Sequence, residues 1–172
     1  MLLERILFPM RHLLILALLS LLVACATPVR DDRLVVGRSS VAQAEGLYGK
    51  PTHIWPEPDG GQTLEYAQQP FGEHCYLLRF DAEGRWLSSR DGLAAAERAK
   101  IAPGMTLQQV QRLLGQERTR VFFRLSGEDV WDWNVTPPSQ GYWLRFNVHF
   151  RDGVVARTTE TLIDLDRRRS SF

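Results

Sequence analysis

The hydrophobic pattern of this chain repeats itself, because residues 40–49 align without gaps on residues 106–115. In both segments a hydroxyl residue, Ser40 or Thr106, precedes a glutamine by three positions, which is the pattern of a capping box at the start of a helix. Both segments end at a glycine, the residue that favours the left-handed conformation found behind many helices. The apolar residues between these ends recur at helical spacing. They are Val41, Ala44 and Tyr48 in the first segment and Leu107, Val110 and Leu114 in the second. The pattern predicts two short amphipathic helices.

Alternating apolar and polar residues, which are typical of strands, follow each predicted helix. The matching pieces are 64–66 with 131–133, and 76–80 with 142–150. Turn signals come next in both halves, at Glu83–Gly84 and at Asp152–Gly153, and returning strands are predicted at 85–89 and 154–161. We therefore expect an α+β fold of two tandem repeats, each a short helix packed on a roughly three-stranded antiparallel meander.

The repeats set the expected division of the chain. The expected segments are a leader (1–24), a tether (25–33), a first repeat (34–90), a connector (91–100), a second repeat (101–163) and a polar tail (164–172). The tail contains three consecutive arginines, 167–169, for which a solvated tail is favoured over a contact with anionic lipid.

The leader has the parts of a bacterial secretory signal: Arg5 and Arg11, a short apolar run, and small residues before Cys25. The apolar run from Leu13 to Val23 is shorter than the about 20 residues that a spanning helix needs. The stretch Leu22-Val-Ala-Cys25 resembles the lipobox at which lipoproteins are processed. This resemblance implies that Cys25 becomes the lipidated first residue of the mature chain, anchored in the outer membrane and facing the periplasm. The alternative is an ordinary signal peptide with a chance cysteine.

Charge argues against a nucleic-acid-binding role. Removal of the leader lowers Lys plus Arg from 21 to 19 and Asp plus Glu from 20 to 19, so the mature protein is formally neutral. Nucleic-acid-binding domains usually carry a basic surplus instead.

Cys75 would be the remaining thiol of the mature chain once Cys25 is lipidated. It is interpreted as a small apolar residue that fills space in the core, with pairing to another molecule as the alternative.

The second repeat resembles a known family. Ile101-Ala-Pro-Gly104-Met-Thr-Leu, which leads into the helix that ends at Leu114-Gly115, resembles the opening motif of the SmpA/OmlA family of BamE-like outer-membrane lipoproteins. That resemblance implies a helix-plus-sheet fold and a role in inserting β-barrel proteins and maintaining the envelope. The tandem pair departs from the usual single domain and is similar in arrangement to the β-lactamase inhibitor proteins.

Alternation along the strands of the second repeat predicts an outward face rich in residue types that are enriched at protein contacts. If Val121, Phe123 and Leu125 pack inward, their neighbours join the outward residues of the next strands. The expected outward set is Trp143, Phe122, Arg120, Arg124, Arg145, Asn147, His149, Asp132 and Asn134. We expect this face to bind an envelope protein, with the β-barrel assembly machinery as one candidate partner. The alternative is that Trp143 and Phe122 pack against the first repeat.

No arrangement of residues in the sequence indicates catalysis. The histidines of the mature chain show neither a paired helical spacing nor a cysteine–histidine ligand spacing, so we expect no metal site and no cofactor. His74 and Cys75 are adjacent, and neighbours on a strand point to opposite faces, which disfavours a thiol nucleophile with a histidine base. We therefore expect a non-catalytic scaffold or accessory factor. An inhibitor or regulator of a periplasmic enzyme is the alternative, and an enzyme that uses Cys75 is a third hypothesis.

Overall fold

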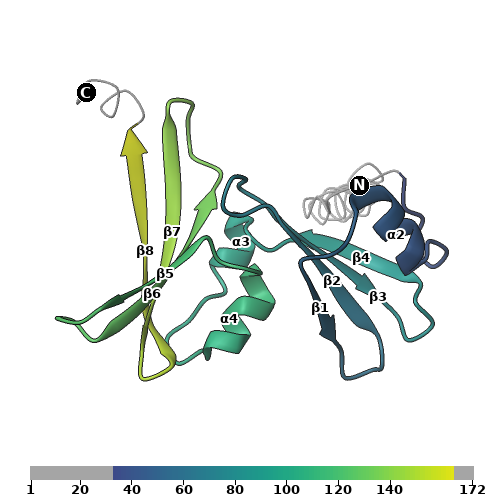
Figure 1. Ribbon diagram of the computed structural model, residues 1–172, viewed down its shortest axis with the longest axis horizontal. Coiled ribbons are helices and arrows are strands. Elements are labelled where there is room, and N and C mark those ends of the chain that lie inside the picture. The colour runs from purple at the N-terminus through teal and green to yellow at the C-terminus, as the bar shows by residue number, and fades with distance from the viewer. Residues whose placement is uncertain (1–32, 165–172) are drawn as a thin grey trace, which may run out of the picture. The chain divides into compact units, whose positions relative to one another are not determined.

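Two antiparallel sheets of four strands each carry the fold of residues 33–164, which are the residues that this computed structural model describes (Figure 1). Cys25 and the arginines at 167–169 lie outside these residues. The first half consists of α2 (Val41–Tyr48), β1 (His53–Pro56), β2 (Gln62–Ala67), β3 (Cys75–Phe80) and β4 (Trp86–Asp91). The second half consists of α3 (Ala95–Arg98), α4 (Leu107–Leu114), β5 (Thr119–Phe123), β6 (Glu128–Val135), β7 (Tyr142–Arg151) and β8 (Val154–Asp164). We call β1-β2-β3-β4 sheet 1 and β5-β6-β7-β8 sheet 2, each in its spatial order.

The expected α+β class is confirmed, and both predicted helices are present. Each begins with a complete capping box, in which Ser40 and Gln43, or Thr106 and Gln109, exchange hydrogen bonds between side chain and main chain. The glycine that follows each helix has a positive φ, as expected, but its ψ is extended. Gly49 has φ 81° and ψ −165°, and Gly115 has φ 79° and ψ −168°. This region of backbone space is essentially restricted to glycine, so both helices stop at a position that other residues adopt only with strain.

The two halves also share a main-chain connection between helix and sheet. In the first half, Trp86 at the start of β4 donates to Ser39 O (2.7 Å) and accepts from Gly37 N (2.8 Å). In the second half, Val155 of β8 makes the equivalent pair of bonds with the segment before α4, both at 2.8 Å. The fourth strand of each sheet therefore holds the start of the helix of its own half.

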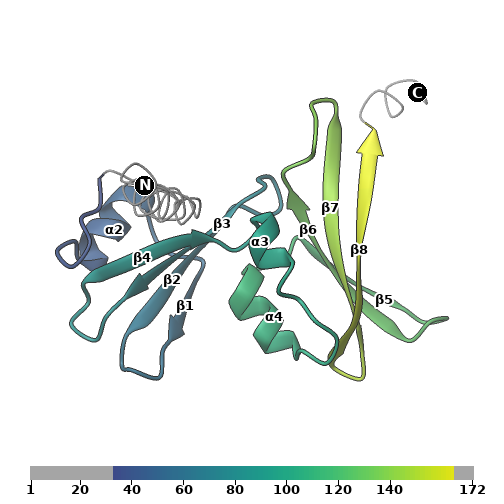
Figure 2. The ribbon, with the colours of Figure 1, turned by 180° about the vertical axis from the view of Figure 1, so that it is seen from behind.

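The apolar core is divided into two clusters. The first lies between α2 and sheet 1 and contains Leu34, Ala44, Leu64, Leu78, Phe80 and Trp86. The second contains Cys75, Leu77, Leu93, Val110, Leu114, Trp131, Trp133, Val135, Phe146, Val148, Phe150 and Val155. Because the second cluster includes Cys75 and Leu77 of β3, α4 packs on sheet 2 and also against sheet 1, as Figures 1 and 2 show. Burial of these side chains drives the folding of both halves.

Each sheet has four strands, where about three were expected. In sheet 1 the additional strand is β1, which is four residues long and ends in Pro56, so that its sequence resembles a loop. The predicted turn at Asp152–Gly153 is present, with positive φ at both residues, as a two-residue hairpin loop requires. β8 extends through Asp164, which had been expected to begin the tail. Within residues 33–164, no helix is long and apolar enough to cross a membrane.

Candidate binding surface

The pairing of β6 with β7 decides which of the predicted site residues share a face. Directly paired residues point to the same side of a sheet. Asp132 is paired with Asn147, and Asn134 with Arg145. His149 and Trp143 alternate with the same parity along β7. The structure thus brings these residues together on the face of sheet 2 that points away from α4, and we call this face the outer face.

The expected orientation of the segment 120–125 was wrong. Arg120 is paired with Trp131, and Phe122 with Asp129, so both residues lie on the opposite side of sheet 2. The guanidinium of Arg120 lies 4.0 Å from the centre of the Trp131 ring, a cation–π contact. Arg124 lies beyond the end of β5, in an exposed turn. Three consecutive apolar residues, 121–123, gave the sequence no parity signal by which to choose the face.

The expected inward packing of the same segment was also wrong. Val121, Phe123 and Leu125 are exposed and pack into neither core cluster. Phe122 is exposed as well.

A buried carboxylate organises the end of the outer face near the β7–β8 turn. Glu128 accepts a hydrogen bond from Arg157 (2.9 Å) and lies 3.1 Å from Nδ1 of His149. The hydrogen bonds from Arg157 and His149 hold the pKa of Glu128 below its ordinary value. His149 also lies 3.0 Å from the Thr159 hydroxyl. The side chains of Glu128, His149 and Arg157 therefore join β6, β7 and β8. Both ring nitrogens of His149 contact side chains of the same sheet.

Asp132 and Asn147 are likewise held by residues in or next to the neighbouring strands. Asp132 accepts hydrogen bonds from the guanidinium of Arg118, at 2.5 and 2.9 Å, and from the hydroxyl of Thr119. Asn147 donates to the hydroxyls of Thr159 (3.2 Å) and Thr161 (3.1 Å). These polar residues of the predicted site thus stabilise the outer face from within, which leaves the aromatic residues as the groups most available to a partner.

A loop of the first half reaches the edge of β6. The side-chain amide of Gln69 donates to Asn134 O (2.9 Å) and accepts from Asn134 N (3.1 Å). The side chain of Asn134 in turn donates to Pro70 O (2.7 Å). Gln69 thus satisfies the main-chain groups of Asn134 as a neighbouring strand would, which suits a position beyond the last β5–β6 pair, Thr119 with Asp132. These three bonds fix the loop beside the outer face.

The loop and sheet 2 together form a small concavity with two exposed aromatic residues. Its volume is about 260 Å³, and its lining residues are Phe71, Glu73, Asn134, Trp143 and Leu144. Phe71 is 95% exposed and Trp143 is 45% exposed. We call this feature the Phe71–Trp143 notch. The sequence interpretation missed Phe71, because Gln69-Pro-Phe-Gly72 looks like a turn. The available signal was a large aromatic residue within that turn.

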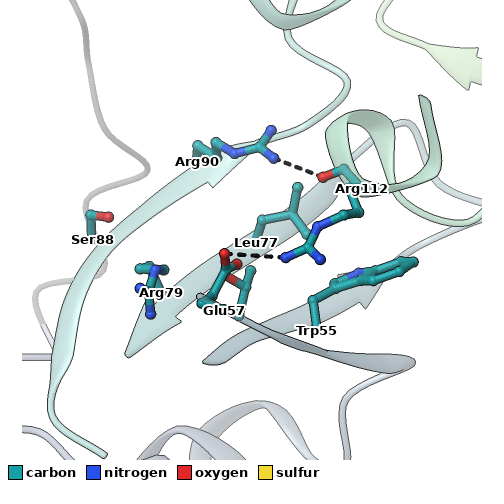
Figure 3. Close-up of a pocket in the computed structure, with 8 residues that line it drawn as sticks. Trp55, Glu57, Leu77, Arg79, Ser88, Arg90 and Arg112 are labelled. Atoms are coloured by element: carbon teal, nitrogen blue, oxygen red, sulfur yellow. Dashed lines mark hydrogen bonds and ion pairs between the residues drawn. The ribbon is translucent and has the colours of Figure 1, made fainter. Parts of the chain in front are cut away.

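A second concavity, of about 230 Å³, lies on sheet 1 beside α4 (Figure 3). Arg112 of α4 forms an ion pair with Glu57 (3.1 Å), donates to Pro56 O (2.9 Å) and lies over the Trp55 ring at 5.4 Å. Arg90 donates to the carbonyl oxygen of Arg112 (3.0 Å). Arg79 is likewise ion-paired, with Asp59. The arginines here are paired within the protein. Their bonds connect α4 to the first half and leave little free charge in this concavity for a ligand.

Cys75 lacks the properties of a catalytic thiol. It is fully buried in the second core cluster, and burial together with the nearby carboxylates of Glu65 and Asp91 raises the pKa of its thiol far above the ordinary value. A nucleophilic cysteine needs a lowered pKa and access to substrate. His74 stacks on Tyr76 and lies 2.7 Å from Asp91. In the described part of the chain, no group of three or more histidine, cysteine or carboxylate side chains is arranged to hold a metal ion.

No family model matches the sequence, and no curated protein is significantly similar. One similar solved structure is that of a "putative beta-lactamase inhibitor protein" from Streptococcus mutans, with a TM-score of 0.31 and 11% identity over 76% of this chain and 91% of that chain. Another is a DUF4309 family protein (YjgB) from Bacillus subtilis, with a TM-score of 0.28 and 15% identity over 76% of this chain and 82% of that chain. At such TM-scores neither likeness carries an argument about this protein.

Proposed function

We propose that this protein is a non-catalytic, outer-membrane lipoprotein that binds an envelope protein and serves as a scaffold or accessory factor in the assembly of β-barrel outer-membrane proteins. The Phe71–Trp143 notch is the observation that carries the binding role. The sequence resemblance of residues 101–115 to the SmpA/OmlA family supports the assembly role. In this proposal the two halves are tandem copies of one helix-plus-sheet unit, and the outer face of sheet 2 is the working surface.

Exposure and rigidity make the notch suitable for a protein partner. Phe71 is 95% exposed, although its loop is held by the three bonds between Gln69, Pro70 and Asn134. Aromatic side chains on a pre-organised surface contribute most to protein binding, because little conformational entropy is lost when they are covered. Glu73 adds a carboxylate to the lining of the notch, whereas Asn134 is buried and already bound to Gln69 and Pro70. A partner with a small apolar projection beside a hydrogen-bond donor would fit it.

The location rests on the leader. Acylation of Cys25 would attach several chains, and two lipid signals already give stable anchoring. The mass of the mature N-terminal peptide tests this directly: a diacylglyceryl-modified and acylated Cys25 supports the anchor. A peptide that begins elsewhere and carries no lipid would overturn it.

Photocrosslinking in intact cells tests the binding role. A photoreactive residue replaces Phe71 or Trp143 in separate variants, and Ile54, an apolar residue of β1 with 46% exposure, is the control position. We expect adducts with components of the barrel assembly machinery from the two notch positions, and none from position 54. The same adducts from all three positions would argue against a specific site at the notch.

A second candidate function is inhibition or regulation of a periplasmic enzyme. The observation that favours it is the presentation of one nearly fully exposed aromatic side chain, Phe71, on a rigid loop, which suits insertion into an enzyme cleft. The crosslinking experiment separates the two functions, because adducts from position 71 with a soluble periplasmic hydrolase would replace those with assembly components.

A further inference from the structure

The tip of the β5–β6 hairpin is apolar and exposed over a continuous stretch. All seven residues from Val121 to Gly127 are exposed, and four of them are the large apolar residues Val121, Phe122, Phe123 and Leu125. Figures 1 and 2 both show this hairpin extending away from the rest of sheet 2. A contiguous apolar patch of this kind on an otherwise soluble surface usually marks a binding site.

The apolar residues occupy both faces of the hairpin. Val121 and Phe123 are paired with Val130 and Glu128, on the outer face. Phe122 is paired with Asp129 on the opposite side, and Leu125 lies in the turn. A protein groove would normally cover one face of a two-stranded hairpin and leave the other in water. A hairpin that is apolar on both faces instead fits surroundings that are apolar on every side, as in the outer part of a lipid layer.

One cation lies within the tip itself, because Arg124 is exposed in the turn between Phe123 and Leu125. Arg120, Arg124 and Arg151 surround the apolar residues, and Arg151 donates to Ser126 O in the turn (3.1 Å). The carboxylate of Glu117 forms an ion pair with Arg120, and that of Glu128 forms ion pairs with Arg151 and Arg157. Residues 120–127 include no acidic residue, and the nearest acidic residues on β6 are Glu128 and Asp129, opposite Phe123 and Phe122. Arg120 and Arg151 are thus balanced by carboxylates of the protein, and Arg124 is the arginine suited to an anionic lipid headgroup. The aliphatic parts of such side chains can lie along the apolar region.

We propose that the tip of the β5–β6 hairpin inserts into the headgroup region of an anionic lipid layer and forms a second, reversible membrane contact. The inference rests on the proposed lipid anchor in one respect: the anchor keeps the chain at a membrane, so that a weak contact forms at high effective concentration. The contact would also fix how sheet 2 is oriented relative to the membrane.

Depth-dependent quenching tests this proposal on the lipid-anchored protein in vesicles of phosphatidylethanolamine and phosphatidylglycerol. An environment-sensitive fluorophore is attached to Ser126→Cys in the turn, and the buried Cys75 does not compete for the label. Ala82→Cys is the matched control, because Ala82 is also exposed at a hairpin turn, between Asp81 and Glu83. We expect a blue shift and a several-fold loss of emission with spin-labelled lipid at position 126, and neither at position 82. The variant with Phe122→Ser and Phe123→Ser should abolish the quenching while the protein stays on the vesicles.

Three results would overturn the insertion of the hairpin. In the first, the position-126 probe is quenched by aqueous iodide and unaffected by spin-labelled lipid. In the second, it is shielded from both quenchers, which would assign the tip to a protein groove or a second copy. In the third, positions 82 and 126 are quenched equally by lipid. Failure of the proposed lipid anchor is a separate result, because the mass of the mature chain would show that acyl groups are missing before the protein is reconstituted in vesicles.

Discussion

Gly115 meets two demands at once, at the end of α4. Its φ of 79° and ψ of −168° are essentially restricted to glycine, and a Cβ there would lie 2.1 Å from Sγ of Cys75 and 3.2 Å from the carboxylate of Glu65. Its carbonyl oxygen accepts a hydrogen bond from Trp133 Nε1 (3.2 Å). Gly49 has the same backbone conformation behind α2, but nothing lies within 4 Å of a Cβ built there. Substitutions at these two positions therefore distinguish the cost of backbone strain from the cost of steric crowding.

We predict that Gly115→Ala lowers the free energy of unfolding more than Gly49→Ala does. Backbone strain costs about 1–3 kcal/mol in both variants, and overpacking against Cys75 adds about 1–3 kcal/mol in the first alone. Urea unfolding of both variants measures the difference, and Cys75→Ala in the Gly115→Ala background should recover part of it. Equal losses in the two variants would contradict the close contact between α4 and β3.

Side chains on the outer face join the strands of sheet 2. Glu128 on β6 contacts His149 on β7 and Arg157 on β8, and these hydrogen bonds lower its pKa. A carboxyl whose pKa is lowered by folding stabilises the native state above its unfolded pKa, here 4.5, and the stabilisation is lost as the pH falls through the lower folded value.

We predict that Glu128→Gln weakens the acid dependence of stability. The wild-type protein should lose stability as the pH falls below 4.5, whereas the variant should show a shallower loss over the same range and a lower stability at neutral pH. Urea midpoints measured from about pH 6 to about pH 3 provide the comparison. An unchanged slope below pH 4.5 would show that Glu128 contributes nothing to it.

The elements were largely predictable from the sequence, and their faces only in part. The capping boxes and the strong alternation of 142–150 predicted α2, α4 and β7, because local spacing alone determines such elements. The face of sheet 2 on which each β5 side chain lies could not be derived from residues 121–123, since all three are apolar. Phe71 was also not identified from the sequence, because the position of its loop beside sheet 2 depends on the bond between Gln69 and Asn134, which are 65 positions apart in the chain.

The second core cluster joins the two halves of the molecule. Leu114 of α4 is fully buried in a cluster that contains Leu77 of sheet 1 and Trp133 of sheet 2. We predict that Leu114→Ala costs about 2–5 kcal/mol and accelerates hydrogen exchange in β3 as well as in β6. Exchange followed by mass spectrometry measures both strands in one experiment. Accelerated exchange confined to sheet 2 would mean that the halves unfold independently.

Quantitative co-purification from cells tests whether the Phe71–Trp143 notch binds an envelope protein. The tagged wild-type protein is compared with Phe71→Ala, with Phe71→Ala/Trp143→Ala, and with Ile54→Ala as the control. Because Phe71 is almost fully exposed, its removal should change stability by no more than about 0.5 kcal/mol. We expect the amount of co-purified partner to be reduced with the single variant, abolished with the double variant and unchanged with the control. Full recovery of the partner by a folded double variant would contradict this expectation.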